Sequence, residues 1–197
     1  MKIYLRDRNL ELVEIWKKTF EKHDNILPSC GDIFSDGDHL NVDAIISPAN
    51  SFGHMDGGID YVYSEYFGWN VSLFLKSKIW QDYDGELLVG QSIAIDIESI
   101  KTSTDKIKYL ISAPTMRVPT DVSQTVNAYL SFKSALKTAK KHNIQSLLCP
   151  GLATSIGKMS YQNCAKQMLK AYEDFLNPVY YDILGDANKV HLKMIGN

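Results

Sequence analysis

Two short apolar runs, each followed by a loop rich in glycine and small residues, limit the fold of this chain most strongly. The runs are VDAIIS (42–47) and SLLCPG (146–151). Such runs are typical of strands buried on both faces of an α/β sheet, because helices cover both sides of that sheet. They therefore predict a central sheet between two layers of helices.

The rest of the chain alternates strand and helix patterns. Further strands are predicted at 2–7, 25–30, 87–96, 108–115 and 190–196, and helices at 9–22, 58–67, 69–81, 121–142 and from about residue 160. Asp7 or Asn9 can cap the first of these helices, Asp121 the fourth and Ser160 the last. The pattern predicts a single three-layer α/β/α domain over residues 1–197, with a mostly parallel or mixed sheet.

Composition and charge argue against some classes of binding partner. The chain has 197 residues, enough for one domain with a sizeable core, and 45% of them are hydrophobic while 22% are charged. A formal net charge of −2 and a pI of about 6.2 argue against broad nucleic-acid binding, which needs a basic face. A local basic pocket for a small anion is compatible with this balance.

No segment has the pattern of a membrane span or a secretion signal. A run of about 18 apolar residues is absent, and residues 1–10 lack the uninterrupted apolar stretch of a signal peptide. Cys30, Cys149 and Cys164 are odd in number and lack Cys-x-x-Cys spacing, so we expect small buried side chains rather than disulfides or a zinc site. These features predict a cytoplasmic protein that does not contact membranes.

The two glycine-rich loops are SPANSFGHMDGGID (47–60) and PGLATSIGKMS (150–160). In open α/β sheets ligands bind beyond the carboxyl ends of the strands, where both loops are expected to lie. Backbone N–H groups on such loops, with a helix N-terminus behind them, favour an anion. Either loop alone could be a plain strand-to-helix turn, but the two together favour a ligand that carries phosphate.

Neither loop matches a standard nucleotide motif. Gly151 and Gly157 are separated by five residues instead of the four of a Walker A loop, and Met159 stands after Lys158 where Ser or Thr would hold magnesium. No G-x-G-x-x-G segment occurs either. An NTPase phosphate loop and a standard dinucleotide fingerprint are therefore both rejected.

Four successive segments resemble the signatures of the macro domain family. They are GDI (31–33), VDAIISPAN (42–50), GGID (57–60) and PGLATSIG (150–157). Common members of that family read GDI, DAIVNAAN, GGGGVD and a later GTGxYG-like loop, and the order and spacing match over roughly residues 25 to 196. The resemblance implies an α/β/α fold that binds ADP-ribose, and some family members hydrolyse ADP-ribosyl linkages.

The resemblance also implies roles for individual residues. Asp32 would accept the adenine amino group beside the Ile33 backbone N–H, Asn50 would bind the distal ribose, and Asp60 would orient a water. The implied ligand-binding residues are Asp32, Ile33, Asn50, Gly57, Gly58, Ile59, Thr154, Ser155, Ile156 and Gly157. The last three would wrap the diphosphate through their backbone N–H groups.

Each of these residues also has a structural alternative. Asp32 could be a turn or cap residue, Asn50 could stabilise its loop through an Asx turn, and Asp60 could be an N-cap or first-turn charge of the following helix. Asp56 is a rival to Asp60, because it stands where many hydrolases of the family have glycine. The candidate catalytic residues are therefore Asn50, Asp60 and Asp56.

Further departures from the family pattern concern the loop after VDAII. Position 47 is serine and position 48 is proline, where Asn-Ala is commoner. His54 and Asp56 could be metal ligands, but two groups without a third at ligand spacing favour solvated loop residues, and His54 could instead be a general base. We expect no metal and no cofactor.

The predicted function is binding of ADP-ribose together with hydrolysis of an ADP-ribosyl linkage or processing of a small ADP-ribose derivative. The alternative is a non-catalytic module that reads or sequesters ADP-ribose or a related nucleotide.

Overall fold

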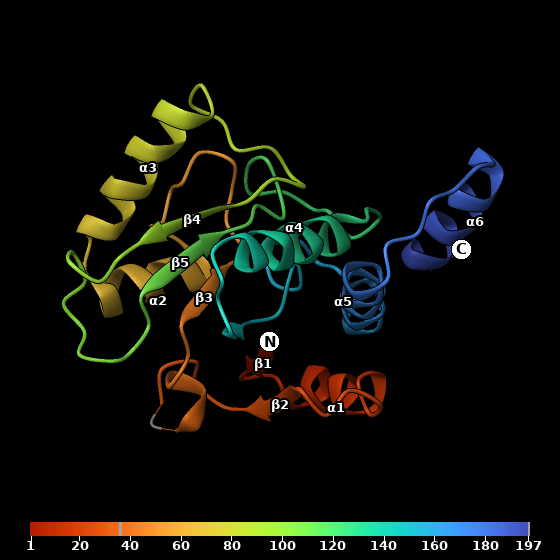
Figure 1. The fold of residues 1–197 in the computed structure, drawn as a ribbon, viewed down its shortest axis with the longest axis horizontal. Coiled ribbons are helices and arrows are strands. Elements are labelled where there is room, and N and C mark those ends of the chain that lie inside the picture. The colour runs from red at the N-terminus through yellow and green to blue at the C-terminus, as the bar shows by residue number, and fades with distance from the viewer. Residues whose placement is uncertain (36, 197) are drawn as a thin grey trace.

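The computed structural model describes residues 1–35 and 37–196 (Figure 1). In chain order the elements are β1 (Lys2–Asp7), α1 (Leu10–Thr19), β2 (Ile26–Cys30), the 3-10 turn η1 (Asp38–Leu40), β3 (Ala44–Ser47), α2 (Gly58–Phe67), α3 (Asn70–Asp82), β4 (Ile93–Asp96), β5 (Tyr109–Ser112), α4 (Asn127–Lys141), β6 (Ser146–Cys149), α5 (Tyr161–Leu176) and α6 (Leu184–Ile195).

The strands form one mixed sheet in the order β2-β1-β6-β3-β5-β4. All neighbouring pairs are parallel except β4 and β5, which are antiparallel. The carboxyl ends of β1, β2, β3, β5 and β6 therefore meet along one edge of the sheet. This arrangement confirms the predicted mixed central sheet.

Helices cover both faces of the sheet, as alternation along the strands requires. Ile46 and Leu147 belong to a buried cluster with residues of α1, α4 and α5, whereas Ile45 and Leu148 pack with residues of α2 and α3. Figure 1 shows α2 and α3 together on the left of the view, with α1, α4 and α5 toward the right. The three-layer α/β/α architecture is confirmed.

Two of the predicted helix caps are confirmed and one is wrong. Asn9 accepts from the Leu12 N–H at 3.2 Å, and Ser160 caps α5 in the same way. Asp121 does not cap α4, which begins only at Asn127. A tertiary contact explains the later start of α4. The Val122 N–H donates to the Gly157 carbonyl at 3.0 Å and holds residues 121–126 against the loop after β6.

The predicted strand at 190–196 is wrong, since residues 190–195 lie in α6 and Gly196 is its C-cap. Val190 and Met194 fit a strand by alternation, but residues four apart also share one face of a helix. Both line the groove between α5 and α6 beside Leu169, and Gly196 ends the helix in the left-handed region at φ +88°. α6 therefore packs on α5 and adds no strand to the sheet.

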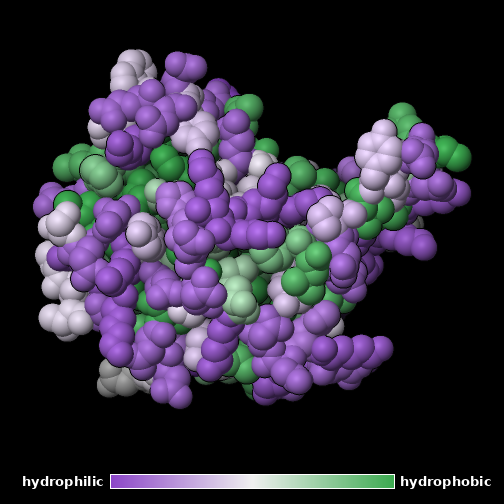
Figure 2. Space-filling model, in the orientation of Figure 1, coloured by the Kyte–Doolittle hydropathy of each residue, from purple (hydrophilic) through white to green (hydrophobic). Residues whose placement is uncertain are grey.

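Hydrophobic side chains are exposed on and before α6. Ile183 and Leu184 are 65% and 83% exposed, and Figure 2 shows hydrophobic surface on this helix where it stands out at the right of the molecule. Within the described part of the chain, no helix is both long enough and apolar enough to cross a bilayer.

Two smaller expectations also change. The predicted strand at 87–96 begins only at Ile93, because Gly90 takes φ +95° and turns the chain before it. Cys149 and Cys164 are buried as expected, but Cys30 is exposed at the end of β2, where the sheet edge faces solvent.

Candidate ligand site at the carboxyl edge of the sheet

A cavity of about 680 Å³ opens at the edge where the parallel strands end. Its walls come from segments that end or follow five strands: 6–8 after β1, 31–33 after β2, 48–62 after β3, 115–119 after β5 and 150–157 after β6. This is where ligands bind in open α/β sheets. The fold therefore gathers segments far apart in sequence around one space.

All of the site residues expected from the sequence line this cavity. They are Asp32, Ile33, Asn50, Asp56, Gly57, Gly58, Ile59, Asp60, Thr154, Ser155, Ile156 and Gly157. Sequence reasoning missed Arg6, Asp7 and Arg8, which bring charge from the end of β1. The one available signal was the charged run RDR at the carboxyl end of an otherwise apolar strand.

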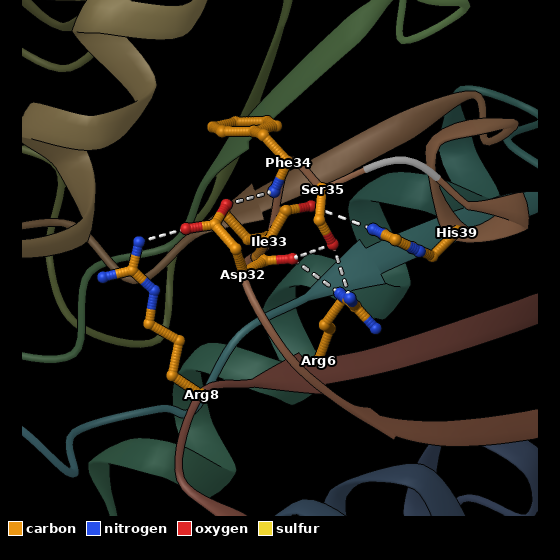
Figure 3. Close-up of polar contacts among 7 residues, drawn as sticks. All are labelled: Arg6, Arg8, Asp32, Ile33, Phe34, Ser35 and His39. Carbon is orange, nitrogen blue, oxygen red and sulfur yellow. Dashed lines mark hydrogen bonds and ion pairs between the residues drawn. The ribbon is translucent and has the colours of Figure 1, made fainter.

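Arg6 fixes the loop after β2 from the end of β1 (Figure 3). Its Nε donates to the Asp32 carbonyl at 2.7 Å, its Nη1 to Ser29 Oγ at 2.9 Å and its Nη2 to Ser35 Oγ at 2.6 Å. Gly31 is required beneath it, because a Cβ there would lie 2.4 Å from Arg6 Nη2 and the residue has φ +145°. The guanidinium therefore holds the backbone of the loop in place.

Two further contacts support the same loop from behind. His39 is buried with Nε2 3.2 Å from the Ile33 carbonyl oxygen, and burial lowers the pKa of its imidazole. The Phe34 ring stacks on Tyr66 with ring centroids 3.6 Å apart and planes 3° from parallel. The loop therefore presents Asp32 and Ile33 to the cavity from a rigid base.

Asp32 is the acidic group at this end of the cavity. Its Oδ1 accepts from the Phe34 N–H at 2.9 Å, and its Oδ2 is paired with Nη2 of Arg8 (Figure 3). The bond to Arg8 and then the Phe34 N–H lower the pKa of the carboxyl group, so it is ionised at neutral pH. The Asp32 side chain is 36% exposed and that of Arg8 75%.

Asn50 stabilises its own loop, as one of the two interpretations of the sequence proposed. Its Nδ2 donates to the His54 carbonyl at 2.7 Å, and its Oδ1 accepts from the N–H groups of Phe52 and His54 at 3.1 and 3.2 Å. The amide thus closes an Asx turn at the wall of the cavity. A role in holding a ribose stays a prediction and would require the amide to share or exchange these bonds.

Asp60 is a buried carboxyl group in the first turn of α2. It is 6% exposed and accepts from Ser47 Oγ at 2.5 Å through Oδ1. Burial raises its pKa to about 7, the bond from Ser47 opposes the rise, and the charge of Asp56 adds to it. Ser47 stood out in the sequence only as a departure from the family pattern, and its bond to Asp60 depends on how β3 and α2 pack.

The loop after β6 is closely packed around Gly157. A Cβ at Gly157 would lie 2.5 Å from the Ala153 carbonyl oxygen and 2.8 Å from Cγ2 of Val122. Ala153 takes φ +61° and its carbonyl also accepts from the Met159 N–H at 3.0 Å. Lys158 points to solvent, with its Nζ 3.7 Å from Asp121 and its side chain 71% exposed. Residues 153–157 of this loop therefore line the cavity, whereas Lys158 does not.

Metal ligation has no support among the residues that the structure describes. His54 and Asp56 are exposed on the loop after β3, and no three His, Cys, Asp or Glu side chains of the described chain converge in a group that could hold an ion.

Comparison with known proteins gives one family match and several similar structures. A family model for a macro-like domain matches residues 12–173. A protein of Aquifex aeolicus that carries no assigned function is 25% identical over 138 residues, which cover 69% of this chain and 76% of that protein.

Similar solved structures reproduce the fold. The macrodomain of Mycobacterium tuberculosis DarG has a TM-score of 0.57 at 18% identity, over 72% of this chain and 89% of that one. A mutant of the Oceanobacillus iheyensis macrodomain with ADPR has a TM-score of 0.59 at 16% identity, over 76% and 83%. Thermosipho africanus DarTG in complex with ADP-ribose has a TM-score of 0.54 at 14% identity, over 98% and 57%.

Proposed function

Because this chain belongs to the macro-like domain family, we propose that its cavity binds ADP-ribose and that it hydrolyses an ADP-ribosyl linkage or a small ADP-ribose derivative. The observation that carries the proposal is the convergence of both glycine-rich loops and Asp32 on one cavity, with a buried carboxyl group, Asp60, in its wall. Support comes also from two structures of similar fold, whose ligands are ADPR and ADP-ribose.

We infer the orientation of the ligand from the chemistry of the cavity walls. Asp32 is ionised and accepts hydrogen bonds, so it suits the exocyclic amino group of adenine and disfavours a keto oxygen. The loop 154–157 offers backbone N–H groups for the diphosphate. The distal ribose then lies toward Asn50 and Asp60, at the loop after β3.

Asp60 is the group best suited to the chemical step. With a pKa of about 7 it is partly ionised at neutral pH and can accept a proton from a water that attacks the anomeric carbon. As the new carbon–oxygen bond forms, the bond to the leaving group breaks, and the proton held by Asp60 passes to that group. The Ser47 hydroxyl fixes Oδ1 in place during both transfers.

A non-catalytic binding module is the second candidate, and the burial of Asp60 favours it. The Asp60 side chain is 6% exposed and its Oδ1 is held by Ser47 Oγ, so the carboxyl group offers little surface to an attacking water. Such a protein would read or sequester ADP-ribose without turning it over.

Two measurements separate these candidates. Calorimetry with ADP-ribose should give a saturable binding curve, and absence of binding would refute both. Single-turnover assays on ADP-ribosylated protein, on ADP-ribosylated nucleic acid and on a terminal-phosphate derivative then distinguish the hydrolase from the binding module. Product from any of them supports the hydrolase, whereas tight binding with no product in all of them supports the module.

The Asp32→Asn variant should bind ADP-ribose more weakly by ~1.5–3 kcal/mol, because it removes a charge-assisted acceptor at the adenine amino group. The asparagine oxygen can still accept from the Phe34 N–H, so the loop should keep its shape. Calorimetry against ADP-ribose and its guanine analogue measures the effect.

Asp38→Asn is the matched control for Asp32→Asn. It removes the same charge from η1, outside the cavity, and should leave affinity unchanged. If Asp32→Asn binds as tightly as the parent protein, the assignment of adenine to this end of the cavity is wrong.

A further inference from the structure

Arg8 is a cation in the cavity wall for which the proposed function has no role. Arg6, two residues earlier, makes three hydrogen bonds, one to β2 and two to the loop after it. The Arg8 side chain is 75% exposed and meets the Asp32 carboxylate through one nitrogen (Figure 3). An exposed ion pair of this kind contributes only ~0–1 kcal/mol, so the guanidinium can leave Asp32 at little cost.

Among the residues that the structure describes, none places an aromatic ring at the base end of the cavity. Among the described residues that line the cavity, Phe52 is the one phenylalanine, tyrosine or tryptophan, and it comes from the loop after β3 with Arg117 5.0 Å over its ring. Phe34 is stacked on Tyr66 and does not line the cavity. A base held by Asp32 would therefore have Ile33 as an apolar neighbour and one flat face without an aromatic partner.

A guanidinium can provide that cover, because it is planar, weakly hydrated and stacks on aromatic rings. Base recognition commonly uses arginine planes in this way. Arg8 occupies Asp32 Oδ2, an oxygen that the adenine amino group would need. Rotation of the exposed Arg8 side chain away from Asp32 would free that oxygen for the base.

We propose that Arg8 is a base-binding residue of this cavity, which exchanges its bond to Asp32 for stacking on the adenine ring when ligand binds. The proposal rests on ADP-ribose binding as proposed above. The amino group of adenine takes the place of the Arg8 N–H on Asp32, and the guanidinium closes over the ring from the solvent side. Arg8 thus contributes to the affinity for the base and does not contact the diphosphate or the distal ribose.

The test is a series of substitutions that separates the plane of Arg8 from its charge. Arg8→Ala should weaken ADP-ribose and AMP binding about tenfold, because the loss of stacking outweighs the loss of competition for Asp32. Arg8→Lys should be at least as weak, since lysine keeps the charge beside Asp32 but lacks a plane. Arg8→Tyr should bind as tightly as the parent protein or more tightly.

Ribose 5-phosphate, which has no base, should bind all four proteins alike. Calorimetry measures each affinity, and thermal unfolding checks that these exposed substitutions leave the fold intact. If Arg8→Ala binds more tightly than the parent protein, Arg8 only competes with the ligand for Asp32. If Arg8→Lys binds as tightly as the parent protein, the charge of Arg8 acts and its plane does not. Parallel losses for ribose 5-phosphate would place Arg8 on the phosphate. Each of these results overturns the proposal while leaving ADP-ribose binding in place, whereas a parent protein that binds neither ADP-ribose nor AMP overturns both.

Discussion

Replacing Asp60 by asparagine should lower the rate of ADP-ribosyl hydrolysis by ~10²–10⁴, the usual contribution of a general base. Asparagine can still accept from Ser47 Oγ, so the geometry of the wall should survive while the proton acceptor is lost. Affinity for ADP-ribose should change little, because the ground state does not need the base. Single-turnover rates and calorimetry on the same preparations measure the two effects separately.

The pH dependence of the parent rate follows from the same carboxyl group. Burial raises the pKa of Asp60 to about 7, and the base must be ionised to accept a proton. The rate should therefore rise with pH and level off above about pH 8. The Asp60→Asn variant should lose this rise, and a profile that persists in the variant would assign the titration to another group.

As pH rises, the free energy of unfolding should fall while the hydrolysis rate rises. In the unfolded chain the Asp60 carboxyl has its ordinary pKa of 3.8, whereas in the folded protein it keeps its proton up to about pH 7. Its contribution is therefore fully present below about pH 4 and is lost as pH rises through 7, by an amount on the order of 4 kcal/mol. Asp60→Asn avoids this loss and should be the more stable protein at pH 8 but not at pH 4.

Asp56→Asn is the control for the rate measurement, and the loss of its charge should also lower the pKa of Asp60. It removes a carboxylate from the same loop, but one that is exposed and lies outside the bond with Ser47. Its rate should stay close to that of the parent. If Asp56→Asn loses the rate and Asp60→Asn retains it, the catalytic role belongs to Asp56.

The Gly157→Ala variant should reduce ADP-ribose affinity by ~10²-fold or more, the second large effect. The added methyl group would lie 2.5 Å from the Ala153 carbonyl oxygen, too close for any side chain, so the loop must shift. Its N–H groups would then no longer converge on the diphosphate. Gly157→Glu should be worse, because it also brings a negative charge toward the phosphates.

Two controls make this result specific. Gly185→Ala adds the same methyl group in α6, where the nearest atom is 3.8 Å away, and should leave affinity unchanged. Lys158→Ala removes an exposed cation beside the loop and should have a small effect. Calorimetry measures the ADP-ribose affinity of the Gly157→Ala, Gly185→Ala and Lys158→Ala variants, and thermal unfolding checks that each is folded. Should Lys158→Ala prove as damaging as Gly157→Ala, a side-chain cation rather than the backbone holds the phosphates.

The sequence by itself determined the features that depend on neighbouring residues. The strands β1, β3 and β6 and the helix α2 lie where short apolar runs and helical spacing predict them, and Asn9 and Ser160 cap their helices from the expected positions. The order of the glycine-rich loops also predicted a cavity at the carboxyl edge, because parallel strands bring their ends together. These signals are local, so a linear pattern can carry them.

Tertiary structure alone decided the features that join distant residues. Whether residues 190–196 form a strand or a helix depended on the groove of α5, since their spacing fits both. Arg8 meets Asp32 across 24 positions of the chain, and no local pattern pairs them. The pKa of Asp60 reflects the packing of α2 on β3, because burial and the Ser47 hydroxyl act on it together. The charge and proton affinity of groups in this site thus depend on the whole fold, whereas the positions of its loops along the chain follow from local sequence patterns.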